Sequence, residues 1–196
     1  MSSDWNDYAD GWDGNSDVRL YADRAFAALD ACAGITAGGW QHKRVLDFGC
    51  GTGLLSGKLA PHVQEVAAVD TSERMIAVLA GKALPNVRAL HADILDGGGA
   101  GQGLRGFDLI CASSVCSFLP DYPGAVARLA GLLNSCGLFV QWDWLARDRG
   151  GCGLTVQQVR DVLQQAGLDG IRVEQVFEMG SGGQAMPVLM GTGSRK

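Results

Sequence analysis

The sequence predicts an α/β fold in which a doubly wound, largely parallel sheet carries helices on both faces. Apolar runs of strand length alternate with helical patterns along most of the chain, and strands separated by helices form βαβ units. The runs also lack the strict alternation of apolar and polar residues that marks strands with one solvated face. The first run ends in three closely spaced glycines, as a buried strand does where it enters a tight turn.

The first half of the chain predicts three helices and three strands. Residues 16–33 carry apolar side chains at three- and four-residue steps, from Val18 to Cys32, which is the stripe of an amphipathic helix that ends at Gly34. The first strand follows at 45–48. The elements expected after it are a helix over 53–60 that Pro61 stops, a strand over 65–70, a helix over 72–83 capped by Thr71 or Ser72, and a strand over 87–92.

The second half continues the same rhythm. The elements expected there are strands over 107–112 and 137–142, a helix over about 122–134 with Asp121 as cap and Pro123 in its first turn, a helix that the capping box at 155–158 opens and that runs to about Gly167, and strands over 171–177 and 186–191. Six of the ten residues from 97 to 106 are glycine. We expect this segment to be a mobile loop, and a slack connector in preference to a functional lid.

Composition and charge limit the classes of protein that fit. With 196 residues, 47% apolar and 19% charged, the chain suits one globular domain. The net charge is −5 without a dense Lys/Arg block, so we expect no nucleic-acid partner, and small neutral or cationic substrates fit better. No apolar leader or bilayer-length run occurs, and the six cysteines form no CxxC pair or metal-ligand spacing. We therefore expect a reduced, cytoplasmic protein with no membrane partner and no metal.

The residues that carry chemistry begin with VLDFGCGTG at 45–53. Gly49, Gly51 and Gly53 lack Cβ atoms, so a ligand can approach the main chain, and the helix that follows offers unpaired N–H groups to an anion. The carboxylate group of a ligand fits at this turn. The dinucleotide fingerprint requires G-x-G-x-x-G, whereas here Leu54 occupies the place of its third glycine. The spacing therefore favours a different ligand.

Three further features follow the glycine turn in order. Asp70 closes the second strand, beside the end of the first strand in a doubly wound sheet, where a carboxylate can accept hydrogen bonds from both ribose hydroxyls. Asp93 follows the third strand and can meet the exocyclic amine of an adenine, with Ile94 and Met75 on the two faces of the ring. Taken singly, each has a common structural role, such as a cap or a core side chain.

These motifs, VLDFGCGTG, AVDTSERM, HADI and FDLICASS, resemble in this order the motifs of the class I S-adenosylmethionine-dependent methyltransferases. The resemblance is close over residues 43–144, and the leader WNDYADGWD at 5–13 looks like the Tyr- and Trp-containing leader of small-molecule members. It implies a Rossmann-like seven-stranded sheet with order 3-2-1-4-5-7-6 and the seventh strand antiparallel. We expect one domain over 1–196, with an N-terminal lid and helix (1–35), a cofactor-binding core (36–144) and a C-terminal helix and β-hairpin (145–196).

The resemblance also implies the site. The residues expected at S-adenosylmethionine, or at its product S-adenosylhomocysteine, are Asp47, Gly49, Cys50, Gly51, Gly53, Asp70, Thr71, Met75, Asp93, Ile94 and Ser113. Among aromatic residues able to enclose the sulfonium, Tyr8 and Trp12 are favoured because a polar leader has little other reason to carry them. Ser114, Tyr122 and Trp144 are expected to face a small-molecule acceptor. Asn134–Gly137 replaces the Pro-Gly-Gly turn of many relatives, so no subfamily's substrate is carried over.

The sequence assigns no catalytic residue and no oligomeric state. Methyl transfer from a sulfonium is an in-line displacement on an activated donor, so alignment can suffice. His42, His62, His91 and Asp143 are weak candidates for a general base, because geometry must come before pKa. Two alternatives stay open: a non-catalytic module that binds S-adenosylmethionine, and an oxidoreductase with a nicotinamide cofactor, which the glycine spacing disfavours.

The leader provides a first prediction. Deleting residues 1–15 should preserve the fold, because the helix over 16–33 and all expected strands remain, but it should weaken binding of S-adenosylmethionine because Tyr8 and Trp12 are lost. Calorimetric titration of both proteins measures this, with circular dichroism as the control for folding. Unchanged affinity of the shortened protein would show that the leader has no part in the site.

Overall fold

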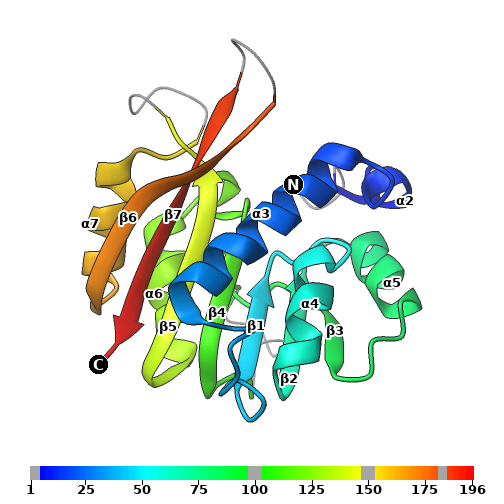
Figure 1. Cartoon of the computed structure of the whole chain (residues 1–196), viewed down its shortest axis with the longest axis horizontal. Helices are drawn as coiled ribbons and strands as arrows, with labels where there is room; N and C mark the ends of the chain where they lie inside the picture. Colours follow the sequence, from blue (N-terminus) through cyan, green and yellow to red (C-terminus); the bar gives the residue numbers. More distant parts are fainter. Residues whose placement is uncertain (1–4, 97–102, 147–152, 181–184) are drawn as a thin grey trace. The chain divides into compact units, whose positions relative to one another are not determined.

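The computed structural model of the chain describes residues 5–96, 103–146, 153–180 and 185–196. Seven strands form one sheet with the order β3-β2-β1-β4-β5-β7-β6 (Figure 1). β7 (Met186–Arg195) runs antiparallel to both β5 (Leu133–Trp144) and β6 (Leu168–Met179). The predicted fold class and strand order are therefore confirmed. By its internal contacts the chain divides into two compact units, Met1–Leu104 and Arg105–Lys196.

The first unit contains the three helices and three strands that the sequence predicts, with small shifts at their ends, and two short elements that it does not predict, α2 (Ala9–Trp12) and the 3-10 helix η1 (Ala60–His62). The predicted elements are α3 (Ser16–Ala33), β1 (Arg44–Phe48), α4 (Leu54–Leu59), β2 (Glu65–Asp70), α5 (Glu73–Gly81) and β3 (Val87–His91). Gly34 ends α3 in the left-handed conformation, as expected. Of the two proposed caps of α5, Ser72 is the one whose side chain accepts a hydrogen bond, from the Met75 N–H.

The parallel register of the first unit brings three strand ends to one edge. Phe48 at the end of β1 pairs with Val69 of β2, and Asp70 at the end of β2 pairs with His91 at the end of β3. The turn that follows β1 therefore emerges beside Asp70. In parallel sheets this carboxyl edge is where ligands bind.

The second unit departs from the expected boundaries at its strands. It contains β4 (Phe107–Ser113), the 3-10 helix η3 (Cys116–Phe118), α6 (Tyr122–Leu132), β5, α7 (Val156–Gln165), β6 and β7. β5 begins at Leu133 and not at 137, because a bulge lies between its pairs Phe107–Leu133 and Leu109–Leu138. The extra residues of this bulge include Cys136 at φ 61° and are polar or exposed, so an apolar pattern does not reveal them.

Helix caps and core burial in the second unit follow the sequence closely. The Asp121 carboxylate accepts a hydrogen bond from the Gly124 N–H at 3.0 Å, and the capping box of Thr155 and Gln158 is present. β6 and β7 extend beyond the expected 171–177 and 186–191, because most of β6 is polar or half-exposed and the added residues of β7, Thr192 to Arg195, are glycine or polar. Apolar runs mark only the buried part of a strand.

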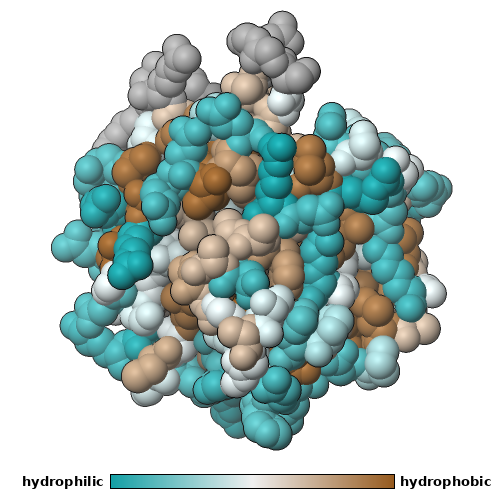
Figure 2. All heavy atoms as spheres, in the orientation of Figure 1, coloured by the Kyte–Doolittle hydropathy of each residue, from teal (hydrophilic) through white to brown (hydrophobic). Residues whose placement is uncertain are grey.

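Buried strands account for the absence of polar alternation. Val45 and Leu46 of β1, and Val66, Ala67 and Ala68 of β2, have no measurable exposure, as expected for strands covered on both faces. The predicted stripe of α3 is correct except at Cys32, which is exposed because the helix ends one residue later. On the face shown in Figure 2, hydrophilic and hydrophobic residues are interspersed.

Two sequence expectations concern segments that the structure describes only in part. The glycine-rich loop at 97–106 lies largely outside the described residues, which resume at 103. Within the described ranges, no helix combines the length and apolar character that crossing a bilayer requires. The predicted division of a single domain at residues 35 and 144 stays a prediction.

Candidate functional site

The turn after β1 is held in place by the end of β2. The Gly49 and Cys50 N–H groups both donate to the carbonyl oxygen of Val69, at 2.8 and 3.0 Å, and the Gly53 N–H closes the turn onto the Cys50 carbonyl at 2.9 Å. Gly49, Gly51 and Gly53 have φ values of 68°, 53° and 79°. Side chains are disfavoured in this left-handed region, so the alternating glycines allow the chain to turn so tightly.

Asp70 joins this turn directly. The Gly51 N–H donates to Asp70 Oδ2 at 2.8 Å, and the Ser72 N–H donates to Asp70 Oδ1 at 2.8 Å. Each carboxylate oxygen has two acceptor positions, so these two bonds leave each oxygen able to accept one more. The predicted proximity of the glycine turn and Asp70 is thus present in the structure.

Two of the glycines have different reasons for lacking a side chain. A Cβ at Gly51 would lie 3.7 Å from Trp12 Nε1 and 4.0 Å from Met75 Sδ, so this part of the turn faces two of the residues expected at the cofactor. A Cβ at Gly53 would lie 2.3 Å from Leu79 Cδ1. Gly53 is therefore required by the packing of α5, whatever the turn binds.

Asp47 lies in the interior beneath the turn. Its side chain is 1% exposed, and its Oδ2 accepts a hydrogen bond from the Ser56 hydroxyl of α4 at 2.6 Å. Burial raises the pKa of Asp47 to about 6; the hydrogen bond from Ser56 opposes the shift, and the negative charge of Asp70 adds to it. Loss of hydration, with smaller contributions from Asp47 and Asp70, raises the pKa of the Cys50 thiol. At neutral pH this thiol stays protonated.

The residues expected around an adenine lie at the ends of β2 and β3. Asp93 is exposed, and its Oδ1 accepts the Leu95 N–H at 2.9 Å, while Ile94 is buried. Thr71 is exposed, and its carbonyl oxygen lies 3.2 Å from His91 Nε2. Asp93 thus lies at the surface of the unit, with Ile94 beneath it.

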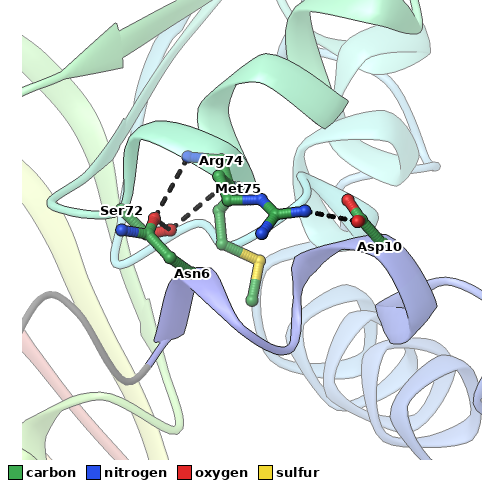
Figure 3. A network of polar contacts seen from close by, with 5 residues as sticks. All are labelled: Asn6, Asp10, Ser72, Arg74 and Met75. Carbon is green, nitrogen blue, oxygen red and sulfur yellow. Dashed lines mark hydrogen bonds and ion pairs between the residues drawn. The ribbon is translucent and has the colours of Figure 1, made fainter.

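The N-terminal segment is attached to α5 by polar contacts (Figure 3). Asn6 Oδ1 accepts a hydrogen bond from the Ser72 hydroxyl at 2.6 Å and a second from the Arg74 N–H at 3.2 Å. The Arg74 guanidinium forms an ion pair with Asp10. Asp13 accepts from the Thr52 hydroxyl at 2.5 Å and pairs with Lys82 at 2.6 Å. The rings of Trp5 and Trp12 meet edge to face with centroids 6.0 Å apart.

Sequence reasoning selected Tyr8 and Trp12 in this segment but missed the polar residues that attach it. Trp12 lies over Gly51, whereas Tyr8 is 59% exposed and stacks at an angle on Trp5. The spacing of Asp10 and Asp13, three residues, does not match the eight residues between Arg74 and Lys82, so no sequence pattern indicated these pairs.

The second unit holds the remaining predicted residues. Ser113 ends β4, and Ser114 has φ 55° and donates its N–H to the Trp142 carbonyl at 2.7 Å. Tyr122 is 8% exposed, and its hydroxyl donates to the buried Gln141 side chain at 2.8 Å. Trp144 is half-buried. An acceptor-facing role for Ser114, Tyr122 and Trp144 stays a prediction.

A buried polar network continues from Tyr122 to Asp143. The Gln141 amide donates to Asp143 Oδ2 at 3.0 Å, and the Ser117 N–H donates to Asp143 Oδ1 at 2.9 Å. Burial raises the pKa of Asp143 to about 7, against the opposing effect of these hydrogen bonds, and burial also raises the pKa of Tyr122. Asp143 has no exposed surface, so its observed contacts hold η3 and offer no base to a ligand. Of the histidines, His62 stacks on Phe26 at 5.9 Å.

The sheet order and the glycine turn define a class I methyltransferase fold, and comparison of sequences agrees. The family model of the methyltransferase domain matches residues 45–137. A relative in Schizosaccharomyces pombe, an uncharacterized methyltransferase, is 34% identical over 105 residues that cover 49% of this chain and 37% of the relative. Residues 45–137 are therefore similar to methyltransferase domains, and the sheet has the strand order of the class I methyltransferase fold. The chain spans less than half of the length of the curated relatives that it matches.

Solved structures share the fold at low sequence identity. The magnesium protoporphyrin IX methyltransferase of Synechocystis PCC 6803, with bound S-adenosylmethionine, is 19% identical with a TM-score of 0.64, over 92% of this chain and 80% of that chain. The cyclase SpnF is 16% identical with a TM-score of 0.69, over 86% and 80% of the two chains. These likenesses concern the fold, which by itself names no reaction.

Burial of Asp143 predicts that stability falls as pH rises. Because its folded-state pKa of about 7 lies above the ordinary 3.8, the folded protein holds a proton that the unfolded chain releases between about pH 4 and 7. The free energy of unfolding should therefore decrease through this window, by at most about 1.4 kcal/mol per pH unit. Asp143→Asn lacks this contribution, so its stability should decline less steeply in urea unfolding between pH 4 and 8.

The substitution keeps an oxygen for the Ser117 N–H, and the Gln141 amide can turn to match the new group. Asp161→Asn is the matched control, since Asp161 has a solvent-exposed hydrogen bond to Gln157. Equal slopes for Asp143→Asn and the unchanged protein would contradict a raised pKa at Asp143.

Proposed function

We propose that the protein binds S-adenosylmethionine and transfers its methyl group to a small-molecule acceptor by in-line displacement. The observation that carries the proposal is the 2.8 Å hydrogen bond from the Gly51 N–H to the Asp70 carboxylate. It places a turn with three glycines next to an acid that retains acceptor capacity. An adenosyl amino acid has a carboxylate at one end and a ribose diol near the other, so it needs both features close together.

The described residues fit this ligand in the following way. The turn from Gly49 to Gly53 would hold the methionine end, and Asp70 would accept hydrogen bonds from the two ribose hydroxyls. Met75 and Ile94 would cover the faces of the adenine, and Asp93 would meet its exocyclic amine. The fit is supported by the acceptor capacity of Asp70 and by the space at Gly51, where a Cβ would make only ordinary contacts.

Methyl transfer requires mainly that this chain align the acceptor with the methyl group and the sulfur of the cofactor. When bound, the cofactor supplies a methyl group on a positively charged sulfur, which is already activated toward a nucleophile. Alignment of reacting groups is worth as much as about 7–11 kcal/mol in well-oriented intramolecular reactions. The carboxylates of Asp47 and Asp70 place negative charge near the turn, which favours a cationic sulfonium over a neutral ligand. No general base is assigned.

A small-molecule acceptor is supported by charge and by likeness. The net charge of −5 disfavours a nucleic-acid substrate, and one protein of the same fold is named for methylation of magnesium protoporphyrin IX. SpnF, which also shares the fold, is named a cyclase. Methyl transfer must therefore be tested separately from cofactor binding.

Thermal unfolding with different ligands tests the binding step. S-adenosylmethionine and S-adenosylhomocysteine at 100 times Kd should each stabilise the protein by about 2.7 kcal/mol, whereas NADH should leave the melting temperature unchanged. Stabilisation by NADH alone would overturn the proposal in favour of an oxidoreductase.

Turnover is measured next, as formation of S-adenosylhomocysteine with a panel of small amines, phenols and carboxylic acids. Formation that depends on one acceptor class supports methyl transfer. The protein would be a non-catalytic binding module if it binds the cofactor but forms S-adenosylhomocysteine no faster than buffer does. This result would have to hold with every compound of the panel and with a cell extract fractionated by size.

A further inference from the structure

We propose that Asn6 is a positioning residue that fastens the N-terminal segment over the cofactor site and thereby slows release of the cofactor. We call this segment, residues 5–14, the strap. The inference rests on the proposed binding of S-adenosylmethionine and assigns a role to a residue that the sequence analysis did not single out. It is argued from the polar contacts of Asn6 and Asp13 and from the position of Trp12.

Asn6 reaches the first turn of α5, where helices leave N–H groups without partners. Its Oδ1 accepts the Arg74 N–H at 3.2 Å and the Ser72 hydroxyl at 2.6 Å. Ser72 is completely buried and also accepts the Met75 N–H at 3.2 Å. One oxygen of Asn6 therefore completes the hydrogen bonding of a buried hydroxyl and caps a helix from outside (Figure 3).

Ser72 connects this contact to the proposed ribose site. The Ser72 N–H donates to Asp70 Oδ1 at 2.8 Å, and the other oxygen of the same carboxylate accepts the Gly51 N–H at 2.8 Å. A continuous chain of hydrogen bonds thus runs from Asn6 through Ser72 and Asp70 to the glycine turn. The carboxylate that would hold the ribose is oriented by the residue that Asn6 holds.

The strap is fixed at its other end by Asp13. This carboxylate accepts from the Thr52 hydroxyl of the glycine turn at 2.5 Å and pairs with Lys82 at 2.6 Å. Thr52 is 1% exposed, so the strap enters the packing of the turn. Trp12, adjacent to Asp13, has its Nε1 3.7 Å from the Cβ position of Gly51. The strap is therefore attached at both of its ends, through Asn6 to the first turn of α5 and through Asp13 to the glycine turn.

Asn6 is a more informative attachment than Asp10 because its partner, Ser72, is buried. The Asp10–Arg74 ion pair has side chains that are 74% and 51% exposed, and such pairs contribute little. Removing Asn6 takes away the acceptor of the Ser72 hydroxyl, which is 0% exposed in the structure, and loss of a buried group's partner is the costlier kind of loss. The strap should then open more often, and bound cofactor should leave faster.

The test compares three variants by stopped-flow release of S-adenosylhomocysteine and by calorimetric Kd. Asn6→Ala should raise the release rate and the Kd about tenfold. Asn6→Asp should restore values close to those of the unchanged protein, because both observed bonds use the side-chain oxygen as acceptor and a carboxylate at a helix N-terminus is favoured. Asn86→Ala is the matched control, since Asn86 also makes two side-chain hydrogen bonds, at 2.8 and 3.0 Å, but before β3 and away from the strap.

The outcomes separate the inference from the proposed function. Asn86→Ala should lower the melting temperature without changing Kd, which shows that general loss of stability does not mimic the effect. Unchanged release and Kd in Asn6→Ala, with normal binding by the unchanged protein, would overturn the role of Asn6 alone. Tighter binding by Asn6→Ala would also overturn it, because the strap would then compete with the cofactor. Absence of binding by the unchanged protein would overturn the proposed function itself.

Discussion

The hydrogen bond from the Gly51 N–H to the Asp70 carboxylate is the contact on which the candidate site depends. It joins the turn after one strand to the last residue of the next strand, and it exists because β1 and β2 are parallel and in register at Phe48 and Val69. The glycines allow the chain to turn back at that edge, and the Val69 carbonyl fixes where the turn begins. This contact therefore depends on the register of the sheet, on the backbone conformation of the glycines and on the carboxylate of Asp70.

Negative charge is concentrated at this point at some cost to stability. Asp47 is buried beside the turn, and its pKa is raised to about 6 by burial and by the charge of Asp70. The surrounding N–H donors and the Ser56 hydroxyl offset part of that cost. A site built for a cationic ligand would use such charge, since binding the ligand also relieves the repulsion between the two acids.

Much of the fold could be predicted from the sequence, because it follows local rules. Asn15, Ser72, Asp121 and Thr155 cap helices in the structure, and the last three of them were expected from their spacing to the apolar pattern. The strand residues 134–136 and the length of β6 were missed because these residues are exposed, polar or half-exposed. An apolar pattern in the sequence cannot reveal strand residues whose main chain pairs with a neighbour but whose side chains are exposed.

The candidate site could be predicted only in part, because some of its contacts follow from motifs and strand order while others join residues that are distant in the sequence. The glycine turn and Asp70 are motif residues, and their contact follows from parallel order alone. The contacts of Asn6 and Asp13 join residues that are 66 and 39 positions apart, and the network from Tyr122 to Asp143 joins a helix to a strand through buried polar atoms. Such pairings depend on tertiary packing, which spacing does not encode.

The most direct test of the central claim is the amide spectrum of the ¹⁵N-labelled protein during titration with S-adenosylhomocysteine. We expect saturable shifts at the N–H groups of Gly49, Gly51, Gly53 and Ser72, because those of Gly51 and Ser72 donate to the Asp70 carboxylate and those of Gly49 and Gly53 belong to the turn that would hold the ligand. Saturable shifts confined to other parts of the chain, or a spectrum that does not change up to millimolar ligand, would contradict the account.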